Sequence, residues 1–450
     1  MEIKKKSSGT ALIPFLVFIA IYLGSGLILQ AQGVEMAFYQ LPAPVAIFCG
    51  IISAFFILKG TAEEKFDALL EGCGNKDIII MCTIYLLAGA FATVSKAMGG
   101  VESTVNLGLT YIPPQFITVG LFVITCFISI STGTSVGSIV AVGPIAVGLA
   151  EKSGLSLPLV LAAVVGGSMF GDNLSVISDT TIAATRTQGC EMRDKFRVNL
   201  YIAVPAAIIT AILLLIFGRP EVVPAMQSYD FSLIKVLPYV LVLVLSIIGV
   251  NVFVVLTLGI VVSGAIGLGF GNLTVLTFSQ EIFNGMLGMV DIFLLSMFTG
   301  GLAQMITKAG GINFLLEKIK TMVKGKRSAE MGIAALVAVT DAAVANNTVA
   351  IIIDGPIAKE MCQEYKVDPR RSAALLDIFS CVMQGIIPYG AQMLIILSFT
   401  KGAVSPFEVL PLLWYQWLLA ISAILSMYIP FADALIKKTP WDWSKEEAKL

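Results

Sequence analysis

Long apolar segments separated by short polar ones run along the whole chain. They cover residues 11–30, 43–58, 77–98, 114–131, 133–150, 157–184 and 198–218 in the first half, and 234–249, 251–270, 289–306, 330–345, 347–362, 371–397 and 409–432 in the second. A helix of about 20 apolar residues crosses the hydrocarbon core of a bilayer, and helices satisfy their own backbone there. The pattern predicts an all-α polytopic membrane protein with about 12–14 membrane segments.

Composition supports a membrane protein and argues against several functions. Of the 450 residues, 57% are hydrophobic and 13% are charged, whereas a soluble domain has about 25% charged residues. The net charge of −1 and the lack of a G-x-x-x-x-G-K-[ST] motif argue against nucleic-acid binding and ATP-driven transport. Seven irregularly spaced cysteines and no histidine give no disulfide framework, zinc site or Ser/His nucleophile. We expect no enzyme activity and no cofactor, and an ion gradient as the driving force.

Basic residues divide the predicted loops into two classes. If the N-terminus is inside, inside loops contain 23 lysines and arginines, among them Lys195, Arg370 and Arg371, and outside loops contain 3. Because lysine and arginine accumulate in cytoplasmic loops, both termini are predicted to be cytoplasmic. Seven segments per half then mean that the second half enters the membrane from the opposite side.

The two halves also resemble each other. The tetrapeptide Gly-Pro-Ile-Ala begins at Gly143 and again at Gly355, and we call the spacing between these two glycines the repeat offset. A basic loop in one half matches a loop without basic residues in the other, as inverted repeats require. We predict two inverted repeats with broken helices or hairpins in the core, at residues 1–225, which carry the main ion-site motif, and 226–450. A generic bundle with coincidental similarity is the alternative.

One apolar segment contains acids where a membrane span should be apolar. Residues 171–181 read GDNLSVISDTT. A charge at mid-bilayer depth costs about 2.5–3.5 kcal/mol on insertion scales, which makes such residues functional candidates. If the segment is one helix, Asp172, Ser175 and Asp179 share a stripe. We predict that it binds a cation or a proton, with these candidate ligands: Asp172, Asn173, Ser175, Asp179 and Thr180.

A second polar motif, TGTSVGS at 132–138, has a counterpart at the repeat offset in VANNTVA at 344–350. Each is followed by Gly-Pro, and both residues weaken a helix. Helix breaks there would let free carbonyls line a cavity, and small hard cations prefer oxygen ligands. This adds further candidate ligands: Thr134, Ser135, Asn346, Asn347 and Gln384. Polar packing between helices, or hydroxyls bonded to their own helix, is the alternative for each motif.

The halves differ in their acids. Gln384 stands where the first half has Asp172, and Ala391 stands where it has Asp179. The second half has acids of its own as possible supporting residues: Asp341, Asp354 and Asp377. Two of these acids also have an explanation without a role in transport. Asp377 could pack beside a lysine, and Asp341 could lie near a membrane face.

Three stretches between residues 131 and 200 carry a family resemblance. GTSVGS, GDNLSVISDTTIAATRTQGC and EMRDKFRVN resemble the NhaC-type Na+/H+ antiporter family, and the pattern of segments extends the resemblance over nearly the whole chain. It implies an ion-transporter fold of inverted repeats and sodium-coupled exchange across a prokaryotic plasma membrane. Some similar proteins exchange organic acids such as malate for lactate, so the resemblance implies the cation more firmly than a second substrate.

The leading hypothesis is Na+/H+ antiport in which both ions compete for a mid-membrane carboxylate. The alternative is a Na+-coupled transporter or exchanger of a small organic anion or amino acid, although no arginine lies in the predicted core to bind a carboxylate. An intramembrane aspartyl protease gives the hydroxyl-rich repeats no role. A channel is a further alternative, which saturable exchange without single-channel current would rule out. The expected partners are Na+, H+, the bilayer and, in the alternative, an organic solute; the number of copies in an assembly is left open.

Overall fold

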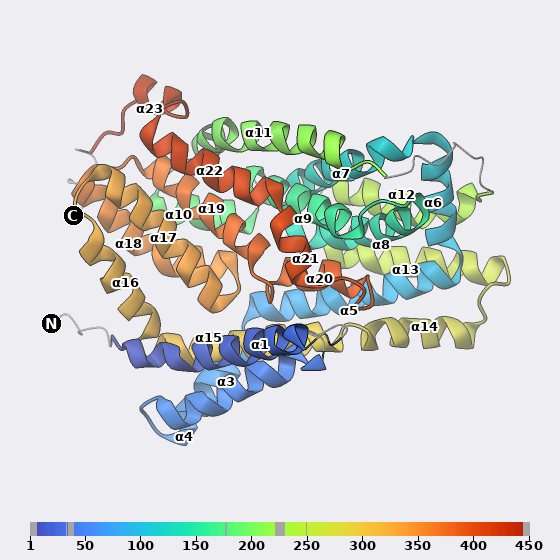
Figure 1. The fold of residues 1–450 in the computed structure, drawn as a ribbon, viewed down its shortest axis with the longest axis horizontal. Helices are drawn as coiled ribbons and strands as arrows, with labels where there is room; N and C mark the ends of the chain where they lie inside the picture. Colours follow the sequence, from blue (N-terminus) through green and yellow to red (C-terminus); the bar gives the residue numbers. More distant parts are fainter. Residues whose placement is uncertain are drawn as a thin grey trace.

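The computed structural model describes residues 7–32, 34, 40–175, 178–220, 230–248 and 250–443, and these form helices and no strand (Figure 1). The helices of the first half are η1 (Gly9–Leu12), α1 (Ile13–Ala31), α3 (Ala43–Ile57), α4 (Ala62–Cys73), α5 (Lys76–Ala97), α6 (Gly100–Tyr111), η2 (Pro114–Phe116), α7 (Ile117–Thr132), α8 (Ser135–Ser153), α9 (Leu157–Leu174), α10 (Asp179–Gln188) and α11 (Met192–Phe217).

The second half continues the all-helical fold. Its helices are α12 (Leu233–Ile247), α13 (Val252–Gly269), α14 (Val275–Leu287), α15 (Val290–Lys308), α16 (Gly311–Met322), α17 (Lys326–Val344), α18 (Asn347–Tyr365), α19 (Pro369–Ile386), α20 (Ala391–Ser398), α21 (Pro406–Val409), η3 (Leu410–Leu412), α22 (Trp414–Tyr428) and α23 (Ala434–Lys438). Each of the fourteen predicted apolar segments overlaps a helix.

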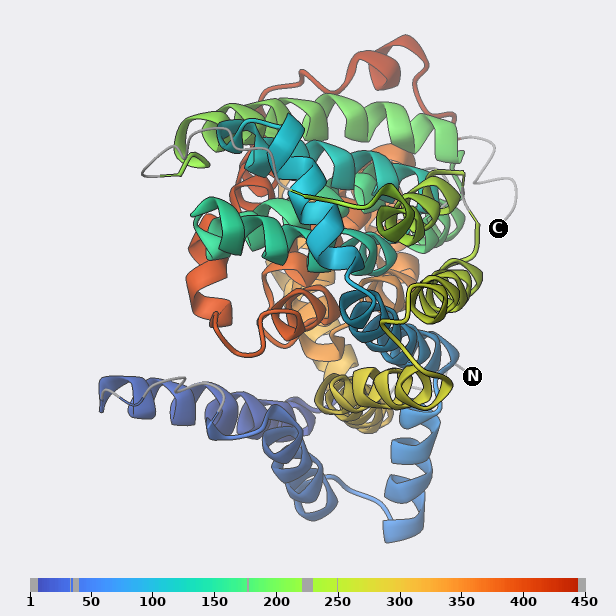
Figure 2. The same ribbon diagram turned by 90° about the vertical axis from the view of Figure 1, so that its right-hand side faces the viewer.

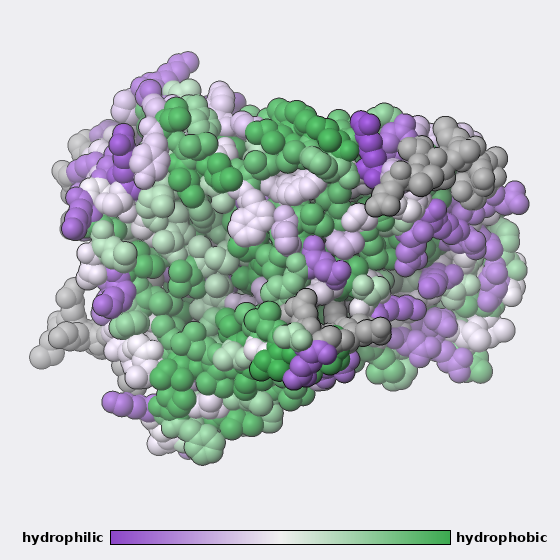
Figure 3. Space-filling model, viewed as in Figure 1, coloured by the Kyte–Doolittle hydropathy of each residue, from purple (hydrophilic) through white to green (hydrophobic). Residues whose placement is uncertain are grey.

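The protein is a multi-pass membrane protein. Within the described ranges, eight helical stretches are long and apolar enough to cross a bilayer, or up to ten if each of two bent helix pairs is one span. Two shorter apolar helices, α3 and most of α12, add to these. Figure 3 shows hydrophobic residues over the middle of the visible face and hydrophilic ones concentrated at its two ends, as expected for a bilayer-embedded molecule.

The order of elements recurs at the repeat offset. The first residues of α8, α9 and α10 are separated by this same spacing from the first residues of α18, α19 and α20, respectively. In Figure 1, α8 lies to the right of the middle of the molecule, and α17 and α18 lie toward the left-hand end. The predicted boundary between the halves, at residues 225 and 226, lies outside the described residues.

The helices pack in two groups. One contains α1, α3, α4, α5, α13, α14 and α15, and the other contains α7 to α11 and α17 to α22. Figure 2 shows α1, α3 and α4, in blue, at the lower edge of the molecule, next to α14 and α15 in yellow. The second group holds all four helix interruptions that build the site described below.

Glycines bring helices of the first group into backbone contact. A Cβ on Gly89 of α5 would collide with the Gly285 carbonyl of α14, and one on Gly285 would collide with the Gly89 carbonyl. Helices α4 and α15 approach each other in the same way, at Gly72 and Gly300. Small residues let membrane helices approach closely, so that dispersion contacts and weak hydrogen bonds between them can form.

Substitution of Gly89 tests this contact. In an open helix, Gly→Ala is favourable by about 0.5–1 kcal/mol, whereas overpacking costs about 1–3 kcal/mol. We therefore expect Gly89→Ala to lower the apparent melting temperature of the detergent-solubilised protein. Gly120→Ala on α7, where a Cβ meets nothing within 4 Å, is the control and is expected to leave it unchanged or raise it. Equal melting temperatures for the two variants would contradict the packing argument.

Candidate functional site

Two helix breaks lie where the TGTSVGS and VANNTVA motifs predicted them. Between α7 and α8, Gly133 has a left-handed backbone (φ 67°) and the Thr134 hydroxyl accepts a hydrogen bond from the Gly137 amide at 3.4 Å. Between α17 and α18, Ala345 has φ 51° and the Asn346 side chain caps Val349 at 3.0 Å. Both breaks precede the Gly-Pro pairs, whose prolines lie inside the continuous helices α8 and α18.

A second pair of interruptions separates α9 from α10 and α19 from α20. The first corrects the sequence prediction that Asp172, Ser175 and Asp179 share one helical stripe. The helix ends at Leu174, Ser175 and Ser178 have extended backbone, and a new helix begins at Asp179. Asp172 is therefore buried, with 5% of its surface exposed, while Asp179 is exposed. As the first residue of α10, Asp179 lies where the helix dipole favours a negative charge.

Two serine hydroxyls converge on the Asp172 carboxylate. Ser135, the first residue of α8, donates to Oδ2 at 2.9 Å, and Ser178 donates to Oδ1 at 2.5 Å. Ser178 also shares a hydrogen bond of 2.8 Å with Thr180. The sequence predicted Asp172, Ser135 and Thr180 as site residues and missed Ser178, although it stands inside the same motif. The carboxylate is thus held by residues from two different helix breaks.

The hydrogen bonds continue from Asp172 into the second half of the chain. Ser135 Oγ accepts from Gln392 Nε2 at 2.9 Å, and Gln392 Oε1 accepts from Gln384 Nε2 at 2.8 Å. Gln384 also donates to the Ala345 carbonyl at 3.4 Å, while its buried Oε1 accepts no hydrogen bond from any residue that the structure describes. All four helix interruptions therefore meet in one polar network. Gln392 was missed, although it is the counterpart of the predicted ligand Thr180 at the repeat offset.

The donor set is suited to a small cation. Asp172 supplies a carboxylate, Ser135 and Ser178 supply hydroxyls, and Gln384 and Gln392 supply amide oxygens; oxygen ligands of this kind bind hard cations. A serine hydroxyl can turn from donating a proton to offering a lone pair. A buried amide oxygen without a donor, such as Gln384 Oε1, calls for a ligand or a water.

The remaining predicted ligands play supporting roles. Thr134 and Asn346 are helix caps. Ser175 Oγ donates to the Ile130 carbonyl at 2.8 Å and so fixes the end of α9 against α7. The Asn347 side chain accepts from the Thr348 amide at 3.0 Å.

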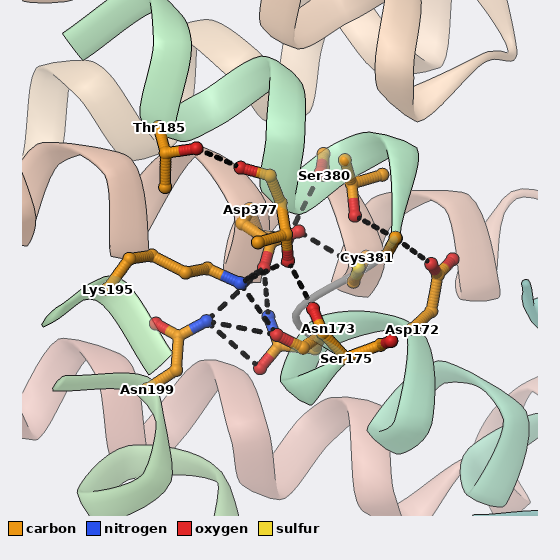
Figure 4. A network of polar contacts seen from close by, with 12 residues as sticks. Asp172, Asn173, Ser175, Thr185, Lys195, Asn199, Asp377, Ser380 and Cys381 are labelled. Atoms are coloured by element: carbon orange, nitrogen blue, oxygen red, sulfur yellow. Dashed lines mark hydrogen bonds and ion pairs between the residues drawn. The ribbon is translucent and has the colours of Figure 1, made fainter. Parts of the chain in front are cut away.

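A second polar cluster lies beside Asp172 and contains a lysine that was predicted to lie in a loop. Lys195 belongs to α11, is 1% exposed and forms an ion pair with Asp377 of α19. It also donates to the Asn173 carbonyl at 2.7 Å and to Thr181 Oγ1 at 2.8 Å. Figure 4 shows the Lys195 side chain pointing toward Asp377 and Asn173. Asp377 therefore has the role predicted as the alternative, the partner of a lysine.

Asparagines complete this cluster. Asn173 and Asn199 each donate to Asp377 Oδ2 at 3.2 Å, and Asn199 also donates to the Asn173 carbonyl at 3.2 Å. Since Asn173 follows Asp172 directly, the cluster fixes the last turn of α9 and with it the direction of the Asp172 side chain.

Arg370 and Arg371 were likewise assigned to a loop. Both lie buried in the first turn of α19, where Arg370 pairs with Asp368. The two arginines stand at the start of the helix, more than three turns before Gln384, and take no part in the Asp172 network.

The fold and the site define a polytopic membrane transporter with a buried carboxylate at the meeting point of four broken helices. A model of the Na+/H+ antiporter family matches residues 2–219 and 227–430, and the chain belongs to this family.

Its relatives include transporters with different substrates. The chain is 25% identical over 459 residues to the malate-2H+/Na+-lactate antiporter of Bacillus subtilis, which covers 92% of this chain and 95% of the relative. It is 24% identical over 464 residues to the Na+/H+ antiporter NhaC of Alkalihalophilus pseudofirmus, covering 95% and 96%. The solved YdaH transporter of Alcanivorax borkumensis aligns with a TM-score of 0.41 at 12% identity over 94% of this chain and 99% of that one.

Proposed function

We propose that this protein is a secondary active transporter of the prokaryotic inner membrane that exchanges Na+ for H+, with Asp172 as the group that binds Na+. The observation that carries the proposal is the buried Asp172 carboxylate, which receives hydroxyls from two helix breaks and is linked to amides from the other half. Membership of the Na+/H+ antiporter family supports it.

Competition for one carboxylate is sufficient for exchange. With Na+ bound, Asp172 is ionised, and the hydroxyls of Ser135 and Ser178 turn their lone pairs to the ion. With a proton bound, the carboxyl group is neutral and the hydroxyls return to hydrogen bonding within the protein. Because an uncompensated charge in this buried site is unfavourable, Asp172 carries one ion or the other. The transporter therefore carries Na+ in one direction of its cycle and a proton in the other.

The division of labour between the halves is part of the proposal. Residues 1–225 supply the charge, through Asp172, and residues 226–450 supply neutral oxygens, through Gln384 and Gln392. With the three buried basic residues removed, the inside loops still hold 20 lysines and arginines against 3 outside. This supports cytoplasmic termini, and η1 and α23 lie toward the same end of the molecule (Figure 1).

Exchange of an organic acid is the second candidate. It is favoured by the similarity to the malate-2H+/Na+-lactate antiporter over 92% of the chain. The core offers little to recognise an anion, because Lys195 is already paired with Asp377 and bonded to Asn173 and Thr181. We therefore place Na+/H+ exchange first.

A flux assay separates the two functions. The purified protein is reconstituted into liposomes with an acidic interior, and the pH gradient is followed with a fluorescent dye. Addition of Na+ alone is expected to dissipate the gradient. A response that requires malate, lactate or an amino acid together with Na+ would favour the organic-acid exchanger. No response with Na+ under either condition would overturn the proposal.

A further inference from the structure

Two aspartates of the second half are buried without a matching charge. Asp341 of α17 and Asp354 of α18 have 0% of their surface exposed. Thr340 donates to Asp354 Oδ1 at 3.1 Å, but neither oxygen of Asp341 nor Oδ2 of Asp354 has a hydrogen-bond partner among the described residues. No described lysine or arginine forms an ion pair with either acid. The Asp172 network does not use them.

Two negative charges are not tolerable in this position. A buried carboxylate without a counter-ion or hydrogen bonds is strongly unfavourable, and Asp341 and Asp354 repel each other when both are ionised. Asp341 also lies in the last turn of α17, where its own carbonyl accepts from the Ala345 amide at 2.7 Å. The negative end of the helix dipole disfavours a further negative charge there. The pair must therefore hold a positively charged ligand.

The ligand that best fits is a proton. Among the described residues, the pair offers four carboxylate oxygens, one of which accepts from Thr340, and the Thr340 hydroxyl itself, whereas hard metal cations such as Ca2+ and Mg2+ take six or more oxygen ligands. A proton on each carboxyl group removes both negative charges, and the two acids titrate as a coupled pair because each charge affects the other.

A small cavity lies at the end of α17, the helix that carries Asp341. Asp341 acts electrostatically on two nearby titratable groups, Cys381 of α19 and Tyr389, which follows α19. The Tyr389 hydroxyl donates to the Ala342 carbonyl at 2.7 Å. Tyr389 also lines the cavity, of about 10 Å3 beside the α17–α18 break, together with Ser296, Thr299 and Asn346. This is roughly the room that one water needs, and Ala345 at its edge lies one turn after Asp341.

We propose that Asp341 and Asp354 form a proton-binding pair separate from the Asp172 cation site. Protons carried here add to the protons exchanged for each Na+. This role in transport rests on the proposed function, whereas occupancy of the pair by a proton does not.

Infrared difference spectroscopy and flux measurements on Asp341→Asn/Asp354→Asn test the proposal. Asparagine mimics the neutral acid, so the double variant is expected to fold. It should lose a carbonyl band of protonated carboxylic acid that the wild type shows at neutral pH. In liposomes, the number of protons exchanged per Na+, obtained from the Na+ gradient that balances a given pH gradient, should fall, while Na+ affinity is kept. Asp291→Asn removes an exposed acid of α15 and is the control. It should change neither the carbonyl band nor the number of protons exchanged per Na+.

Three outcomes would overturn the inference. One is a double variant that retains the band and the wild-type proton count. Another is a wild type without the band whose Na+ affinity is lost in the double variant, since the pair would then bind Na+. The third is a number of protons exchanged per Na+ that falls as much in Asp291→Asn as in the double variant. If a folding defect affects the double variant, Asp354→Asn alone should shift the band, because one acid remains. A wild type with the band but without Na+/H+ exchange would overturn the proposed function and leave the proton pair standing.

Discussion

Asp172→Asn is expected to abolish Na+-dependent proton flux in liposomes. Asparagine keeps the size of the side chain and can accept from one of the two serines while it donates to the other, but it carries no charge and binds no proton at working pH. Removing one partner of a buried pair of opposite charges costs about 3–5 kcal/mol, and each 1.4 kcal/mol is a factor of ten in affinity. Na+ binding should therefore weaken by at least about tenfold, and the exchange of Na+ for a proton at this site should stop.

The matched control is Asp179→Asn, the same change seven residues along the same motif. Asp179 is exposed at the start of α10, so this variant is expected to keep most of the wild-type flux. Flux lost in both variants would mean that the two aspartates share the site, as their spacing in the sequence predicts. Wild-type flux in Asp172→Asn would remove Asp172 from the mechanism altogether.

Hydrophobic patterning was sufficient to predict the membrane helices and the position of two breaks. An apolar run of this length can form few structures in a bilayer other than a helix, because the backbone must satisfy its own hydrogen bonds there. Two polar motifs separated by the repeat offset identified the breaks at Gly133 and Ala345. Asp172 was predicted for a similar reason, since a charged residue in an apolar membrane segment is costly and is therefore a candidate functional residue.

The contacts that order the site were harder to predict because they join distant parts of the chain. Lys195 stands in EMRDKFRVN, which reads as a polar loop, and only its ion pair with Asp377 explains its burial. Asp179 was misplaced because the helix was assumed to continue through residues 175–178, which have no glycine or proline. In this case tertiary contacts, such as Thr181 Oγ1 donating to the Ser175 carbonyl at 2.8 Å, stabilise the break.

The unequal acids of the halves have a common physical explanation. In the first half, Asp172 is surrounded by hydroxyl donors, and in the second half Asp377 is neutralised by Lys195. Lys195 contacts a carbonyl, a hydroxyl and a carboxylate, so one buried acid has a fixed cation and the other is left to an exchangeable one. Lys195 and Asp377 should thus each be needed to compensate the charge of the other within the fold, whereas Asp172 should serve transport.

Asp377→Asn is accordingly expected to destabilise the protein. It leaves the Lys195 ammonium buried among neutral groups, and breaking a buried pair by removing one partner costs about 3–5 kcal/mol. The melting temperature in detergent, followed by the loss of the monodisperse peak in size-exclusion chromatography, should fall clearly below that of the wild type. Asp341→Asn is an informative comparison because no lysine or arginine in the described part of the chain forms an ion pair with Asp341. The melting temperature of this variant should stay close to that of the wild type.

Removing the charge of Lys195 as well should restore stability. In Lys195→Met/Asp377→Asn, methionine has nearly the length of lysine and no charge, and replacing a buried ion pair with neutral groups of similar volume is often neutral or stabilising. Recovery of the melting temperature in the double variant would show that the uncompensated charge, rather than a lost hydrogen bond to Asn173 or Asn199, is what destabilises Asp377→Asn. If the double variant were as unstable as the single one, the charge argument would be wrong and the hydrogen-bond network around the end of α9 would carry the stability instead.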